Sequence, residues 1–99
     1  MTAKECLKIP MQENDANAKT VGEYFEKLIY TLWVEEDCFS GKRPFGNSGW
    51  KGEIYTALVK AGVVSGVVDE DGFLEDYDDI EADRVCIGLI HEIFKGGAR

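Results

Sequence analysis

Apolar residues recur at helical spacing from residue 21 onward. They step by three or four residues and predict an amphipathic helix over residues 20–35, with inward positions Val21, Phe25, Leu28, Ile29, Leu32 and Trp33. Thr20 and Glu23 have the spacing of a capping box, which places the start of this helix. Three carboxylates at residues 35–37 oppose the negative end of the helix dipole, so we expect the helix to fray there.

A second, shorter helix is predicted to follow residue 48. Either Asn47 or Ser48 can cap it, and its inward positions are Trp50, Ile54, Ala57, Leu58 and Ala61. Lys60 falls in its last turn, where a cation is favoured. Gly62 follows and can adopt the left-handed conformation that ends many helices.

A hairpin and a third helix are predicted in the last third of the chain. Paired valines and the Asp71-Gly72 turn signal predict a β-hairpin over residues 63–77. Asp78, Asp79 and Glu81 then favour a helix start. This helix ends at Gly96-Gly97, and its apolar stripe consists of Ala82, Val85, Cys86, Leu89, Ile90, Ile93 and Phe94.

The N-terminal residues differ from the rest. Residues 1–19 show no sustained periodicity, which predicts a mobile or loosely packed arm in which residues 6–9 are compatible with a short strand. Residues 20–99 predict a single globular α+β domain in the order α-α-β-β-α, with two main amphipathic helices and a short β-hairpin. The 44% hydrophobic and 11% aromatic content suffices for one small core.

The segment from Ser40 to Trp50 is too rich in glycine for a helix or strand and too aromatic for a plain connection. Residues 40–62 carry a charge of +3, between −4 over residues 20–39 and −7 over residues 63–79. The helix N-terminus that follows favours an anion, so this loop is a candidate for contacting a protein or an anionic group. The candidate residues are Lys42, Arg43, Phe45, Asn47, Ser48, Trp50 and Lys51.

A purely structural interpretation of this loop stays open. Phe45 and Trp50 would then fill the core, and the glycines would permit a tight turn. Asn47 or Ser48 would only cap the second helix. The G-x-x-x-x-G-K-[ST] order of a phosphate-binding P-loop is absent from the loop.

The charge distribution offers an alternative function. A net charge of −8 argues against direct nucleic-acid binding, because the chain repels phosphates at long range. A helix followed by a hairpin is similar to a winged helix, but this wing would be acidic and would oppose DNA. The hairpin could instead imitate a nucleic-acid backbone and inhibit a nucleic-acid-binding host protein, using Asp69, Glu70, Asp71, Asp76 and Asp79.

The residue pattern gives little support to catalysis or metal binding. An EF-hand register with Gly72 at position six puts Val67 at position one, so no calcium loop is predicted. His91 is the single histidine, and it lies about 140° around the third helix from Cys86. We therefore expect a binding protein rather than an enzyme, with no cofactor and no metal.

The cysteines and the apolar runs bear on location. Cys6, Cys38 and Cys86 are widely spaced and form no C-x-x-C pair, which indicates reduced, buried thiols. No signal-peptide pattern occurs, and no apolar run approaches the roughly 20 residues that span a bilayer. We expect a cytoplasmic protein without membrane contact, and the amphipathic helices leave a homo-oligomer open.

The run Gly41-Lys42-Arg43-Pro44-Phe45-Gly46-Asn47-Ser48-Gly49-Trp50 resembles a segment of small uncharacterised proteins encoded by bacteriophages and prophages. In that group an amphipathic helix precedes the segment and a Leu-Val-Lys-Ala-Gly-Val-Val type run follows it, so the resemblance covers residues 20–65. The group has no assigned activity. The resemblance therefore implies a phage origin and the host cytoplasm as location, and it implies no mechanism.

Overall fold

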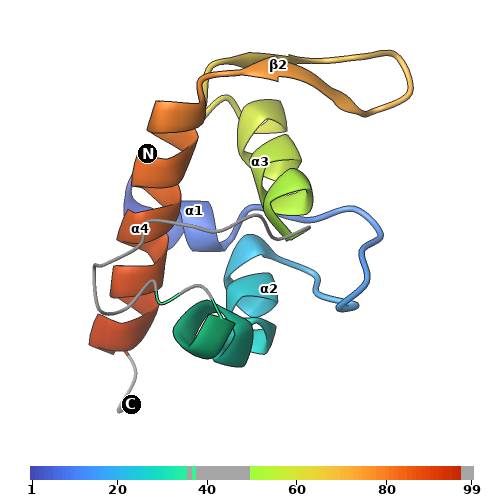
Figure 1. The fold of residues 1–99 in the computed structure, drawn as a ribbon. Helices are drawn as coiled ribbons and strands as arrows, with labels where there is room; N and C mark the ends of the chain where they lie inside the picture. The colour runs from blue at the N-terminus through green and yellow to red at the C-terminus, as the bar shows by residue number, and fades with distance from the viewer. Residues whose placement is uncertain (36, 38–49, 97–99) are drawn as a thin grey trace.

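A two-stranded antiparallel hairpin lies across one end of a group of helices, and its turn projects beyond them (Figure 1). The computed structural model describes residues 1–35, 37 and 50–96. The elements are α1 (Ala3–Leu7), α2 (Val21–Lys27), the π-helical turn η1 (Thr31–Glu35), α3 (Trp50–Lys60), β1 (Gly66–Val68), β2 (Leu74–Tyr77) and α4 (Asp79–Gly96). The predicted small α+β fold in the order α-α-β-β-α is confirmed, with α1 as an additional short helix.

The chain begins with a helix that the sequence analysis did not predict. Thr2 and Glu5 form a capping box, in which the Thr2 hydroxyl oxygen accepts from Glu5 N at 3.2 Å and the Glu5 carboxylate accepts from Thr2 N at 3.0 Å. Cys6 therefore lies in α1, and the strand suggested for residues 6–9 is wrong. The segment 1–19, expected to be mobile or loosely packed, places Cys6, Ile9 and Ala18 in the core.

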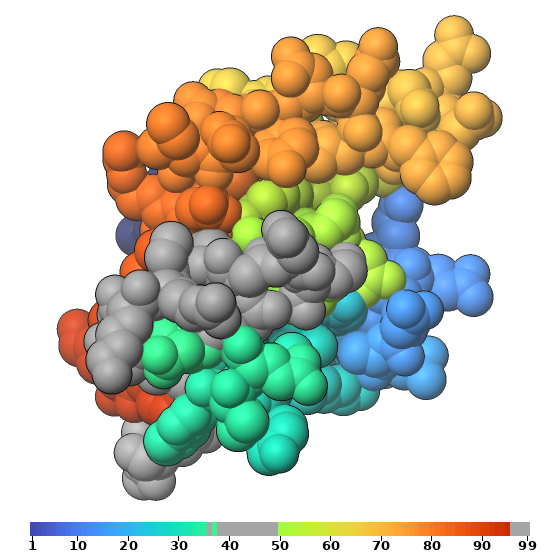
Figure 2. Space-filling view, viewed as in Figure 1, coloured from blue at the N-terminus to red at the C-terminus, as the bar shows by residue number. Residues whose placement is uncertain are grey.

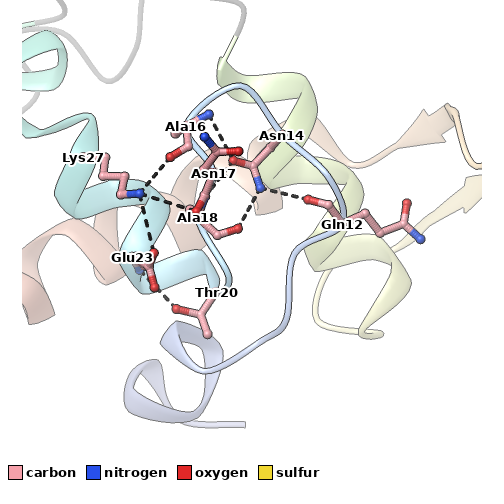
Figure 3. A network of polar contacts seen from close by, with 8 residues as sticks. All are labelled: Gln12, Asn14, Ala16, Asn17, Ala18, Thr20, Glu23 and Lys27. Carbon is pink, nitrogen blue, oxygen red and sulfur yellow. Dashed lines mark hydrogen bonds and ion pairs between the residues drawn. The ribbon is translucent and has the colours of Figure 1, made fainter.

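Asn14 organises the chain between α1 and α2 (Figure 3). Its amide nitrogen donates to the carbonyl oxygens of Gln12 and Ala18, both at 2.8 Å. Its amide oxygen accepts from Ala16 N at 3.1 Å and from Ala18 N at 3.0 Å. Lys27 approaches from α2, and its ammonium group donates to Ala16 O at 2.8 Å. One asparagine thus makes four bonds that fix the course of residues 12–18.

The helix predicted over residues 20–35 is divided in the structure. Thr20 caps α2 as expected, since its hydroxyl oxygen accepts from Glu23 N at 3.2 Å. The α2 helix ends at Lys27, and the π-helical turn η1 follows. Because π-helical hydrogen bonds join residues five apart, the spacing that predicted the apolar stripe does not hold in η1. Trp33 is consequently 59% exposed, and its assignment to the buried stripe is wrong.

A close backbone contact at Gly66 sets the hairpin against α3. Gly62 ends α3 in the left-handed region with a φ of 78°, as predicted. In the sheet register, Gly66 of β1 pairs with Tyr77 of β2. A Cβ atom at Gly66 would lie 2.5 Å from Asp76 O and 3.0 Å from Val59 Cγ2. The absence of a side chain at Gly66 is therefore what lets β1 approach both its partner strand and α3.

The α4 helix begins where the sequence predicts and supplies much of the core. Asp78 precedes it, and the Asp78 carboxylate accepts a hydrogen bond from Glu81 N at 3.0 Å. The helix packs against α1 and α2. Its buried side chains join those of α2 and α3 in one cluster and are Ala82, Cys86, Leu89 and Ile90.

Candidate functional site

The predicted binding loop falls mostly outside the described residues. Five of its seven candidates lie there: Lys42, Arg43, Phe45, Asn47 and Ser48. Trp50 and Lys51 belong to the first turn of α3, and Lys51 is half-buried. The Trp50 side chain is 5% exposed, and its ring meets the Phe25 ring edge-on with centroids 5.9 Å apart. Trp50 thus joins α3 to α2 inside the core, as the structural interpretation of the loop predicts for this residue.

The hairpin and the start of α4 carry seven exposed carboxylates. Five are the candidates of the alternative surface and two adjoin them: Asp69, Glu70, Asp71, Asp76 and Asp79, with Glu75 and Asp78. Residues 69–71 lie at the turn, Glu75 and Asp76 lie within β2, and Asp78 and Asp79 follow that strand. In the sheet register Asp76 is paired with Val67, two residues before Asp69. The acidic surface is therefore a ridge that runs along the hairpin from its turn to the start of α4.

Part of this charge also holds the backbone. Asp69 Oδ1 accepts hydrogen bonds from Asp71 N and Phe73 N, both at 2.9 Å. Asp69 N donates to Phe73 O at 2.8 Å, which closes the turn. The hydrogen bonds of the described residues give no such backbone role to the side chains of Glu70, Asp71 and Glu75. Asp69 is therefore part of the framework of the turn, whereas the side chains of Glu70, Asp71 and Glu75 contribute charge.

Apolar side chains are exposed among these carboxylates. Val67 on β1 is 53% exposed, Phe73 at the turn is 71% exposed, and Ile80 in the first turn of α4 is 68% exposed. Aromatic side chains are enriched at protein interfaces because they offer a large rigid contact area. The acidic ridge therefore carries exposed apolar side chains, including an aromatic ring, in addition to its negative charge.

A groove with a volume of about 800 Å³ lies beneath the hairpin turn. Its walls come from residues 9–14, from one face of α3 and from residues 72–74. Figure 2 shows the end of the hairpin standing over the N-terminal segment at this side of the molecule. Ile9 and Ala57 supply buried apolar surface, and Leu74 is half-buried. The volume falls in the range of roughly 300–1,000 Å³ that is common for ligand pockets.

Three charged side chains line this groove. Lys60 Nζ donates to Gln12 Oε1 at 2.8 Å, which ties α3 to the N-terminal segment. Glu53 lies two turns earlier on α3 and accepts a hydrogen bond from the Tyr24 hydroxyl. Glu13 is exposed on the N-terminal wall. The groove thus has two carboxylates and one ammonium group, and that ammonium group already binds an amide oxygen.

Sequence reasoning did not find the groove. Helical spacing places its α3 residues on one face, since Glu53, Thr56, Ala57 and Lys60 are three, four and seven residues apart. The opposing walls come from residues 9–14 and 72–74, which no local pattern joins to that face. Only the tertiary fold brings these three segments together.

A buried polar pair connects α3 to α4. The Tyr55 hydroxyl donates a hydrogen bond to the Asp83 carboxylate, and the Tyr55 side chain is 2% exposed. Burial, and then this hydrogen bond, raises the pKa of Tyr55 well above its ordinary value. The pair therefore holds the phenol in its neutral form and serves packing rather than proton transfer.

The groups considered for catalysis differ in their exposure to solvent. His91 is exposed on α4. Cys6 and Cys86 are buried thiols as predicted, whereas Cys38 lies outside the described residues, and burial raises the pKa of the Cys6 thiol. Across residues 1–35, 37 and 50–96, no three His, Cys, Asp or Glu side chains gather so that they could hold a metal ion. In the same part of the chain, no helix has the length and apolar character needed to cross a membrane.

Comparison of the chain with protein-family models, with curated proteins and with solved structures finds no match. Two candidate sites have a described geometry. One is the acidic ridge of residues 69–79 with its exposed apolar side chains. The other is the groove beneath the hairpin turn. The two meet at Gly72, Phe73 and Leu74, which belong to the hairpin and line the groove.

Proposed function

We propose that this chain is a small protein-binding module whose acidic hairpin engages a basic surface of a partner protein. The observation that carries the proposal is the 71% exposure of the Phe73 side chain at the turn. It lies between Asp69-Glu70-Asp71 and Glu75-Asp76 in a segment with a charge of −7. An exposed aromatic ring among negative charges is expected on a surface that binds a positively charged, partly apolar partner.

The two properties of the ridge have separate physical effects on binding. The carboxylates create a negative field that attracts a basic partner within about a Debye length and speeds association. The exposed ring and aliphatic side chains then supply apolar contacts, which slow dissociation. Basic surfaces of this kind occur on proteins that bind nucleic-acid backbones. The chain would thus act as an acidic mimic or inhibitor of such a host protein, in the cytoplasm of a phage-infected cell.

A second candidate function uses the loop of residues 40–51. Lys42 and Arg43 are adjacent cations in a chain of net charge −8, and they precede the start of α3. This charge pattern supports contact with a protein or an anionic group. The double variant Lys42→Ala, Arg43→Ala should then lose a partner interaction that the hairpin variants below retain. If it folds and keeps every interaction of the unaltered chain, this second candidate is excluded.

The hairpin is tested by removing charge that has no backbone role. The triple variant Glu70→Gln, Asp71→Asn, Glu75→Gln keeps Asp69 and hence the turn. We expect its affinity for a fluorescein-labelled hexa-arginine peptide at low salt to fall about tenfold, since exposed ion pairs contribute about 0.2–1 kcal/mol each. Fluorescence anisotropy gives the dissociation constant, and added salt should reduce the difference.

A matched control separates position from net charge. The variant Glu26→Gln, Glu35→Gln, Glu92→Gln removes the same number of carboxylates away from the hairpin. It should bind the peptide nearly as well as the unaltered chain, because it leaves the ridge intact. Equal losses in the two triple variants would show that only total charge matters, which contradicts the proposal.

A further inference from the structure

The groove and the acidic ridge form one continuous surface. Gly72, Phe73 and Leu74 belong to the hairpin and also line the groove. The carboxylates of Asp69, Glu70 and Asp71 precede these residues at the same turn. Any partner segment that lies along the turn therefore also reaches the mouth of the groove.

The groove itself has an apolar interior and a negative border. Ile9 and Ala57 are buried, and Phe73 stands exposed at the edge. Glu13 and Glu53 contribute two carboxylates against the one ammonium group of Lys60, which donates to Gln12 at 2.8 Å. An anionic ligand would meet these carboxylates and those of the turn, whereas a cationic one would complement them.

We propose that this groove takes one or two large apolar side chains from a short basic segment of the partner, while the Lys and Arg residues beside them meet the carboxylates of the hairpin turn and Glu13. The inference rests on the proposed function, because it concerns the same partner. It adds that recognition depends on apolar side chains at a defined place, and not on charge alone. The occupant is therefore a peptide segment with one or two large apolar side chains flanked by cations.

Matched peptides test this specificity. Fluorescein-labelled peptides of the form Arg-Lys-X-X-Arg-Lys, with X as Leu, Phe or Trp, are compared with the peptide in which X is Ser. At least one apolar peptide should bind the full chain about tenfold more tightly than the Ser peptide, because burying one large apolar side chain accounts for at least that factor. The charge of all four peptides is the same, so the ridge alone would not distinguish them.

Variants then place the preference in the groove. Ala61 directly follows α3 and lines the groove, and it is exposed, so its predicted inward position is wrong. Ala61→Trp therefore fills the groove without entering the core. It should remove the preference for apolar peptides and leave binding of the Ser peptide unchanged. Thr56→Trp is a second filling variant, should Ala61→Trp fail to fold. Gly88→Trp is the control, since Gly88 is exposed on α4 and a Cβ there meets nothing within 4 Å.

The outcomes separate the groove from the ridge. Equal binding of apolar and Ser peptides, or an apolar preference that survives both filling variants, overturns the groove inference. If the triple variant Glu70→Gln, Asp71→Asn, Glu75→Gln still weakens binding in that case, the proposed function stands without the groove. If none of the four peptides binds, both proposals fail. An apolar preference that Gly88→Trp retains and Ala61→Trp or Thr56→Trp abolishes supports the inference.

Discussion

Tyr77 of the hairpin packs its ring against Tyr55 of α3, with centroids 5.2 Å apart and planes tilted by 56°. The Tyr55 hydroxyl in turn donates to Asp83 of α4. An isolated two-stranded hairpin is at best marginally stable in water, so it needs such a support. Tyr77 thus contacts Tyr55 of α3, and Tyr55 in turn links α3 to α4. The hairpin that carries the acidic ridge is therefore supported by both helices.

The Tyr55 to Asp83 bond should make stability sensitive to alkaline pH. Tyr55→Phe removes the bond and leaves the half-buried Asp83 carboxylate without this donor, which should cost about 1–3 kcal/mol near neutral pH. Because the folded-state pKa of Tyr55 is raised, its stabilising contribution is complete below about pH 10 and is lost as the pH rises above that value. The difference in the free energy of unfolding between the unaltered chain and Tyr55→Phe should therefore decrease above pH 10, by up to about 1.4 kcal/mol per pH unit.

Urea unfolding from pH 8 to pH 11 at constant ionic strength measures this gap. Tyr30→Phe is the matched control, because Tyr30 is 70% exposed. It should follow the pH dependence of the unaltered chain. A gap for Tyr55→Phe that stays constant to pH 11 would refute the buried hydrogen bond.

Gly66→Ala should displace the hairpin from α3. The added Cβ would lie 2.5 Å from a backbone oxygen and 3.0 Å from a methyl group of Val59, so the strands must shift. Overpacking of this kind typically costs about 1–3 kcal/mol. Gly88→Ala on α4 is the control, since a Cβ there meets no atom and alanine favours helix by about 0.5–1 kcal/mol. Thermal unfolding should show a lower midpoint for Gly66→Ala and an equal or higher one for Gly88→Ala.

Asn14→Ala should loosen the N-terminal wall of the groove. The variant loses four hydrogen bonds to backbone groups of residues 12–18. At about 0.5–1.5 kcal/mol per bond, partly replaced by water, we expect a loss of about 2–3 kcal/mol. Amide hydrogen exchange should accelerate at residues 16 and 18.

The control for this variant is Asn17→Gly. Asn17 adopts a φ of 53°, which glycine tolerates without strain, so stability should change little. If the amides of residues 16 and 18 exchange as slowly in Asn14→Ala as in the unaltered chain, other contacts hold this segment.

The sequence predicted the elements whose signals are local. Asp71 and Gly72 marked the turn, and the structure places Gly72 there with a φ of 88°. Gly62 marked the end of α3 in the same way. The long apolar stripe in the sequence predicted both where α4 begins and ends and which of its faces is buried, because a regular α-helix preserves the three- and four-residue spacing.

Two parts of the fold escaped prediction for different reasons. Thr2 and Glu5 have the same T-x-x-E spacing as Thr20 and Glu23, so the sequence does contain a local signal for the start of α1. The π-helical turn η1 has no comparable signal, because the same residues also fit a continuous α-helix. The helical spacing of Trp33 therefore predicts a buried side chain, whereas that side chain is exposed.

The candidate site was predictable only as a charge pattern. The run of carboxylates from Asp69 to Asp79 is visible in the sequence, and so is the loop with Lys42 and Arg43. The arrangement of the carboxylates along the hairpin depends on how its two strands pair, and the groove depends on three distant segments. Such arrangements arise from long-range packing, which periodicity and motif spacing do not encode.

The most direct test of the central claim is photo-crosslinking from the hairpin turn. Phe73 is replaced by p-benzoylphenylalanine, and the same group placed at Tyr30 is the control, because the two side chains are 71% and 70% exposed. In cells that express the chain, we predict that the group at position 73 forms a crosslink to a Lys- and Arg-rich surface of one partner. The group at position 30 should form no such crosslink. Identical products from both positions, or a crosslink from position 73 only to neutral or acidic surfaces, would contradict the account.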